Sequence, residues 1–165
     1  LTPDLIVTRH VIEHVPDPIQ WLRDIHQVSA QYLFLSIPDR RYTFDYFKPV
    51  TDAVDWLRWH DEKLARPSSW QILRHIYYQA DLRTAGAWQG NIPADHMNRY
   101  SMPAAIERAE SLSASYTDVH CSIFTHDSFK RLMSDLAQIV PWRIVRTEDV
   151  RENSNEFRAL LVRSS

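Results

Sequence analysis

Glycine is scarce in this chain: its 165 residues include only Gly86 and Gly90. Phosphate- and dinucleotide-binding loops need glycines where the backbone approaches the ligand. No glycine-rich nucleotide loop can therefore be built from this sequence. Cysteine is scarcer still, because Cys121 is the single one. This excludes an internal disulfide and a cysteine-rich zinc site, and it fits a reducing compartment.

Net charge and long apolar runs are also lacking. The formal net charge of −2 gives no electrostatic reason to expect a nucleic-acid partner or an anionic membrane. No apolar run approaches the roughly 18 residues of a membrane span, and residues 1–4 do not resemble a signal peptide. We therefore expect a cytoplasmic protein. The chain starts at Leu1 rather than Met and soon enters a strand-like run, which suggests a cut within a longer domain.

Hydrophobic periodicity predicts a strand, a helix and a second strand at the start of the chain. Residues 4–8 form a short β-branched run that suits a strand buried on both faces of a parallel sheet. Asp17 and Pro18 suit the N-cap and first position of a helix over residues 18–29. Residues 32–37 predict the next buried strand, so the three elements form a βαβ crossover.

The rest of the chain predicts a helical middle and a closing hairpin. Four further helices are expected: one over residues 51–64, and one beginning at each of the Ser68 cap, Pro103 and the Thr125 cap. Residues 86–98 are expected to form a loop, and residues 142–147 and 157–162 are expected to form strands. We divide the chain into a strand–helix–strand unit (1–39), a helical insert that covers the acceptor (40–119), and a closing helix with an antiparallel strand pair (120–165). The fold class is α/β, a doubly wound parallel sheet that ends in an antiparallel hairpin.

Four parts of the chain carry a family resemblance. Residues 10–18, HVIEHVPDP, are similar to the hxxLEHVxDP run that follows the fourth strand of many class I S-adenosyl-L-methionine (SAM) methyltransferases. Residues 32–39 resemble the fifth strand and its exit, and residues 38–45, PDRRYTFD, resemble one bacterial subgroup. The closing helix and strands resemble the last elements of the family. The resemblance implies a partial Rossmann-like sheet with strands 4, 5, 7 and 6 of the order 3-2-1-4-5-7-6, the C-terminal half of a methyltransferase type 11-like domain.

The resemblance also implies where the cofactor lies. SAM would cross the carboxyl ends of the strands near Thr8, Arg9 and His10, where open α/β sheets bind ligands. The family's glycine-rich loop and its acidic ribose-binding residue are absent, and residues 29–31 replace its Lys-Pro-Gly-Gly turn. Two alternatives therefore stay open: a SAM-dependent methyltransferase or its acceptor-side fragment, and a non-catalytic methyltransferase-like module.

Methyl transfer from a sulfonium needs two oriented partners and a base for a hydroxyl or amine acceptor. His120 is the expected general base, since an imidazole titrates near neutrality, and Asp118 is expected to orient it. Asp39 and Tyr42 follow the second predicted strand and are the other two catalytic candidates.

Arg41 and His96 are the candidate substrate-binding residues. Arg41 can hold an anionic or polar group through two hydrogen bonds, and His96 lies in a loop that could form a lid. The family resemblance suggests a small-molecule or glycan acceptor. Four tryptophans of the insert are either stacking surfaces for that acceptor or the insert's own core: Trp56, Trp59, Trp70 and Trp88.

A zinc hydrolase is the third and least favoured alternative. His10, Glu13 and His14 form the HxxEH pattern of inverzincins. That pattern requires a helix, and Pro16 and Pro18 leave little room for one. We therefore expect no metal ligands.

The resemblance implies that one flank of the first predicted strand is uncovered. In the intact domain strand 1 of the family would pair there, and an open edge exposes unpaired backbone groups. We expect the chain to form a homodimer through this edge or to aggregate.

Overall fold

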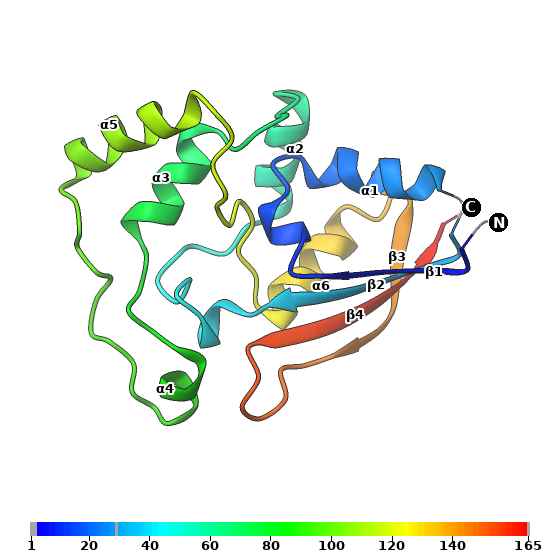
Figure 1. Ribbon diagram of the computed structural model, residues 1–165. Coiled ribbons are helices and arrows are strands. Elements are labelled where there is room, and N and C mark those ends of the chain that lie inside the picture. Colours follow the sequence, from blue (N-terminus) through cyan, green and yellow to red (C-terminus); the bar gives the residue numbers. More distant parts are fainter. Residues whose placement is uncertain (1–2, 29, 165) are drawn as a thin grey trace.

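The described residues form one four-stranded sheet with helices along one of its faces (Figure 1). The computed structural model describes residues 3–28 and 30–164. Within these residues the strands lie side by side in the order β1 (Leu5–Arg9), β2 (Tyr32–Pro38), β4 (Glu156–Arg163) and β3 (Trp142–Glu148). β1 and β2 are parallel, whereas β4 runs antiparallel to both β2 and β3. The predicted crossover and the closing antiparallel hairpin are therefore both present.

Three helices pack on one face of this sheet. They are α1 (Pro18–Gln27), α2 (Ala53–Asp61) and α6 (His126–Asp135). Alternate side chains of β2 and β4 point toward them, as the period of two along a strand requires. The shared core includes Ile19 and Leu22 of α1, Trp56 and Trp59 of α2, Phe129 and Leu132 of α6, and Leu33, Leu35, Phe157 and Leu161 of the strands.

Local sequence signals explain where these helices begin. The Asp17 side chain accepts a hydrogen bond from the Gln20 backbone N–H at 2.9 Å and caps α1. Thr125 caps α6 through a capping box. Phe124 and Phe129 flank that cap, and their ring centroids lie 5.4 Å apart. The predicted starts of α1 and α6 are confirmed.

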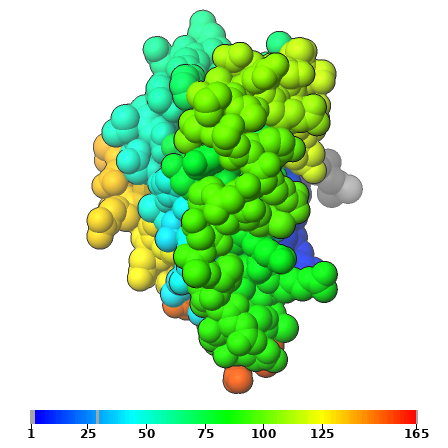
Figure 2. All heavy atoms as spheres, turned by 90° about the vertical axis from the view of Figure 1, so that its left-hand side faces the viewer, coloured from blue at the N-terminus to red at the C-terminus, as the bar shows by residue number. Residues whose placement is uncertain are grey.

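A second group of helices, the outer helices, comprises α3 (Ser69–Tyr77), α4 (Thr84–Trp88) and α5 (Met102–Ser113). They lie beyond the carboxyl ends of β1 and β2 (Figure 1) and form most of the face that Figure 2 shows. α3 and α5 pack around a small cluster of Ile72, Ala109, Val119 and Cys121. The predicted loop over residues 86–98 is wrong at its start, because α4 continues to Trp88. None of the helices in the described residues is long and apolar enough to cross a bilayer.

The opposite face of the sheet is open in the part of the chain that the structure describes. Leu5 and Val7 of β1 point to this face and are 47% and 62% exposed, and Tyr32 and Phe34 of β2 are only half-buried. The expectation that β1 is buried on both faces is therefore wrong. A β-branched run predicts a strand but does not reveal whether a second layer covers it. The sheet is compatible with a partial Rossmann-like fold.

Val7→Lys is expected to weaken self-association of the chain. β1 is an edge strand of the described sheet, and a lysine on an edge strand opposes pairing with a second copy. We expect the dissociation constant of a dimer to rise about tenfold or more. Sedimentation equilibrium measures this, with Val54→Lys as the matched control, because Val54 lies on α2 and is 71% exposed. A wild-type chain that stays monomeric at high concentration would contradict pairing through this edge.

Candidate active site at the strand ends

A cavity of about 280 Å³ lies where the carboxyl ends of β1 and β2 meet the outer helices. Its walls come from both strand exits, the insert and the start of β4. The lining residues are His10, Pro38, Thr43, Phe44, Leu82, Arg83, Thr84, His120 and Asn155. A larger hollow of about 600 Å³ lies between α1 and the end of α2. We place the site in the smaller cavity, since open α/β sheets bind ligands at the carboxyl ends of their strands.

His10 forms the turn that leaves β1. Its backbone has a φ of 51°, a left-handed conformation that costs roughly 1–3 kcal/mol for a residue other than glycine. Its Nε2 lies 3.0 Å from Glu156 Oε2, and Arg9 Nε donates to the same oxygen at 3.0 Å. Burial lowers the pKa of His10, although Glu156 opposes this. The contact with Glu156 fixes the imidazole at the cavity wall against the start of β4.

His120 enters the same cavity from the segment before α6. Its Nδ1 lies 2.6 Å from Asp45 Oδ2, and its side chain is 12% exposed. Burial alone would raise the pKa of Asp45, but the hydrogen bond from His120 and the charge of Lys48 lower it to about 2. Asp45 is therefore a permanent carboxylate that orients the His120 ring. The Nε2 atom of His120 is left for other partners.

A buried lysine completes this network. Lys48 Nζ is fully buried and forms an ion pair with Asp45, and it lies 3.1 Å from His75 Nδ1. Burial lowers the pKa of Lys48 while Asp45 opposes the change. Burial and then the charge of Lys48 lower the pKa of His75 to about 3. A neutral His75 can thus accept hydrogen bonds at Nδ1 from Lys48 and from the His120 backbone N–H, which is 3.1 Å away.

Glu13 and His14 lie beside His120, in the short 3₁₀ helix η1 (Ile12–His14). Both carboxylate oxygens of Glu13 are buried and have no hydrogen-bond partner, and burial raises the pKa of this group to about 7. The His14 and His120 rings meet edge to face with centroids 4.7 Å apart. Asp118, the expected partner of His120, instead lies 2.7 Å from His14 Nδ1. Asp45 is the carboxylate that orients His120.

Comparison with known protein families decides the affiliation of the chain. Residues 1–136 match the family described as "Methyltransferase domain". The chain belongs to this family. As residues 10–18 imply, it is a class I SAM-dependent methyltransferase-like domain. No curated protein and no solved structure matched the chain.

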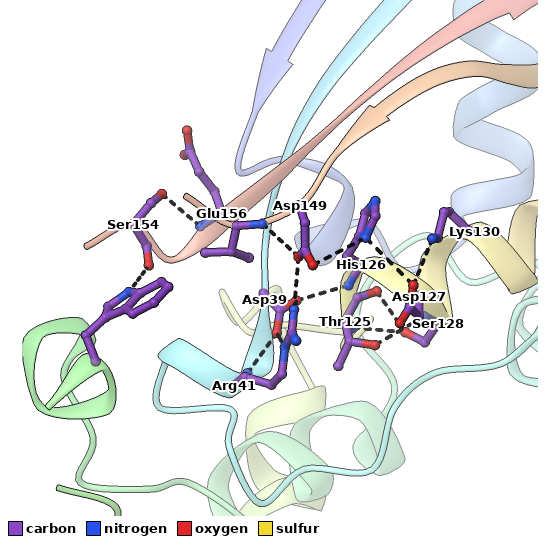
Figure 3. Close-up of polar contacts among 12 residues, drawn as sticks. Asp39, Arg41, Thr125, His126, Asp127, Ser128, Lys130, Asp149, Ser154 and Glu156 are labelled. Carbon is purple, nitrogen blue, oxygen red and sulfur yellow. Dashed lines mark hydrogen bonds and ion pairs between the residues drawn. The ribbon is translucent and has the colours of Figure 1, made fainter. Parts of the chain in front are cut away.

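In this methyltransferase domain Asp39 is a buried carboxylate whose oxygens accept hydrogen bonds from Arg41 and from the start of α6 (Figure 3). Its Oδ1 accepts from Arg41 Nε at 2.8 Å and from the Arg41 backbone N–H at 3.0 Å. Its Oδ2 accepts from Arg41 Nη2 at 2.8 Å and from the His126 backbone N–H at 3.0 Å. With four donors and no exposed surface, this carboxylate joins the end of β2 to the start of α6. The geometry argues against the predicted catalytic role of Asp39.

Arg41 and Tyr42 belong to the 3₁₀ helix η2 (Arg40–Tyr42) and do not line the cavity. Arg41 pairs with Asp39 and lies 3.1 Å from Asp149, and the hydrogen bonds to Asp39 raise its pKa. The Tyr42 ring stacks on Trp88 with centroids 4.5 Å apart. Both predicted functional residues therefore fix η2 against α4 and the hairpin.

The other candidates from the sequence are spread around the site. Thr8 lies within β1 opposite Leu35, and Arg9 extends into solvent with 72% of its side chain exposed. His96 packs against Tyr77, with ring centroids 4.8 Å apart, and does not line the cavity. Of the predicted site residues, His10 and His120 are the two that line the strand-end cavity in the described part of the chain.

Sequence reasoning missed Asp45 and Lys48. Asp45 and Lys48 are three residues apart, so a tight turn brings their opposite charges together. Phe44 precedes Asp45 and Phe47 precedes Lys48, and these aromatic neighbours indicate that the charged pair is buried. Opposite charges in an aromatic segment are the signal that could have identified the pair, because buried charges must be paired. Cys121 is buried, and burial raises the pKa of its thiol to about 12.

Proposed function

We propose that this methyltransferase domain transfers a methyl group from SAM to a small-molecule or glycan-type acceptor in the strand-end cavity. The observation that carries the proposal is the position of His120. Its imidazole lies at the carboxyl ends of two parallel strands and is held by a buried carboxylate in a member of a methyltransferase family. We further infer that β1, β2, β4 and β3 correspond to strands 4, 5, 7 and 6 of that family.

The residues of the chain fit the sulfonium end of SAM better than its adenosine end. His10 presents its ring in a strained turn at the exit of β1, and Asn155 and Thr43 add polar groups to the same cavity. A glycine-rich loop for the adenosine half cannot come from Gly86 and Gly90, which lie in the insert. When bound, SAM supplies an activated methyl group. We propose that His10 and its neighbours position the reacting end of the donor.

His120 is the proposed proton acceptor for the nucleophile. A hydroxyl or amine acceptor must lose its proton during transfer, and a positioned histidine can take it. The Asp45 carboxylate holds Nδ1 and stabilises the imidazolium that forms when Nε2 accepts the proton. Thr43, Thr84 and Arg83 provide donors and acceptors for a polar substrate along the wall. The single cysteine fits a cytoplasmic setting for this chemistry.

A direct test combines donor binding with product formation. Isothermal titration with SAM, followed by detection of S-adenosylhomocysteine over a panel of hydroxylated, amino and monosaccharide acceptors, measures both steps. The purified chain and any longer protein that carries it are compared. We expect SAM binding and transfer in the longer protein, and weaker SAM binding in the chain alone, because the chain supplies no glycine-rich loop.

The outcomes separate the alternatives. SAM binding without transfer to any acceptor would favour the non-catalytic module. No binding heat and no S-adenosylhomocysteine in either protein would count against the enzymatic proposal as a whole.

A further inference from the structure

Three potential metal ligands converge beside the strand-end cavity. One ligand atom each from Glu13, His14 and His120 lies within 4.8 Å of the other two. A point equidistant from three such atoms is at most about 2.8 Å from each, and side-chain shifts of less than about 1 Å reach the 2.0–2.2 Å bonds of zinc. The group joins η1 to the segment before α6, which are far apart along the chain.

Glu13 gives an independent indication that this site holds a cation. Its side chain is fully buried, and neither carboxylate oxygen has a hydrogen-bond partner among the described residues. A buried carboxylate without a partner costs several kcal/mol unless a cation or donors compensate it. His14 Nε2 lies 3.7 Å from Glu13 Oε1, which is too far for a hydrogen bond.

His120 is arranged as metal-bound histidines usually are. Metal-bound histidines generally direct their second ring nitrogen at a carboxylate, which fixes the ring and raises its basicity. Here Nδ1 of His120 is hydrogen-bonded to Asp45 at 2.6 Å. Nδ1 of His14 lies 2.7 Å from Asp118 but makes no hydrogen bond with it. The His120 ring therefore directs its Nε2 away from Asp45, where an ion can bind it.

We propose that Glu13, His14 and His120 bind one divalent transition-metal ion of the zinc class. Two imidazole nitrogens and one carboxylate oxygen suit zinc, whereas magnesium prefers a set of oxygen ligands. Three protein ligands leave a fourth coordination position for water or for an acceptor oxygen.

This site differs from the HxxEH arrangement. Residues 12–14 form only a 3₁₀ turn, and His10 turns away to pair with Glu156. The sequence gives no indication that His120 joins Glu13 and His14. The ion would also occupy the Nε2 lone pair with which His120 accepts a proton, so metal binding and proton acceptance exclude each other at this residue.

Zinc titration of the purified chain, without SAM, tests the site separately from the proposed transfer. We expect one zinc per chain by calorimetry, and loss of affinity by at least tenfold in Glu13→Gln and in His120→Gln. His60→Gln is the matched control: His60 Nδ1 lies 2.9 Å from Asp17, but its Nε2 faces Arg23 at 2.8 Å rather than a carboxylate. We expect this variant to bind zinc as the wild type does.

Cobalt substitution provides a second readout. A Co²⁺ ion on this ligand set gives visible absorption bands of a four- or five-coordinate centre, and these bands should disappear in Glu13→Gln. Near-ultraviolet circular dichroism shows whether each variant is folded, and Glu13→Gln is nearly isosteric. No zinc binding by the wild type, binding equal in wild type and Glu13→Gln, or preference for Mg²⁺ over Zn²⁺ would each overturn the proposal.

Discussion

Asp45→Asn is expected to cost about 3–5 kcal/mol of the free energy of unfolding, the loss typical when a buried ion pair is broken. Lys48 Nζ is fully buried beside this carboxylate. An asparagine leaves that ammonium group without a countercharge in a region of low dielectric, and it also removes the charged acceptor of His120 Nδ1. The cost therefore arises from the remaining charge more than from the lost contact.

Urea denaturation at neutral pH measures this effect through the transition midpoint. Asp55→Asn is the matched control, because Asp55 meets Arg58 and Arg74 only at 3.7 and 3.4 Å near the surface. Such pairs contribute about 0–1 kcal/mol. The double variant Asp45→Asn/Lys48→Met should recover much of the loss, since it removes both charges. A loss below about 1 kcal/mol for Asp45→Asn alone would show that Lys48 finds another partner or is neutral.

His120→Gln is expected to lower the rate of methyl transfer by about 10²- to 10⁴-fold, the usual contribution of a positioned general base. This prediction rests on the proposed function. Glutamine keeps a polar side chain at the cavity but cannot accept the proton of the acceptor. The dissociation constant for SAM should stay within a few-fold of wild type, because the base acts on the acceptor.

Single-turnover rates in the presence of a chelator separate this role from metal binding. His60→Gln, outside the cavity, should retain the wild-type rate. If His120→Gln transfers methyl groups at more than about a tenth of the wild-type rate, proton acceptance belongs to another group or to water.

Much of the fold could be predicted because its signals are local. The capping residues Asp17, Ser68 and Thr125 mark the starts of three helices, and each accepts the expected backbone hydrogen bond. Apolar runs likewise locate all four strands of the described sheet. The exposure of Val7 could not be predicted, since it depends on which layer covers the strand and not on the strand itself.

The site was harder to predict because its contacts are formed between distant segments. Asp118 is close to His120 in sequence, yet Asp45 from the turn after η2 orients the ring. Asp39 lies at the predicted sheet edge, but a backbone donor from α6 and the side chain of Arg41 occupy its oxygens. The sequence shows which chemical groups are present and how far apart they lie along the chain. Which of these side chains form hydrogen bonds with one another depends on how the insert packs against the sheet.

The return path of the insert has a consequence for engineering. Arg66 donates a hydrogen bond to the Ala114 carbonyl at 2.9 Å. The two ends of the segment that contains the outer helices therefore lie next to each other. The entropic cost of closing a loop between fixed ends rises only slowly with the length of the loop. Segments of different length could therefore be grafted between these two positions while α2 keeps Trp56 and Trp59 in the core. On the proposed function, acceptor selectivity would then be exchanged as a module, leaving the sheet beneath it intact.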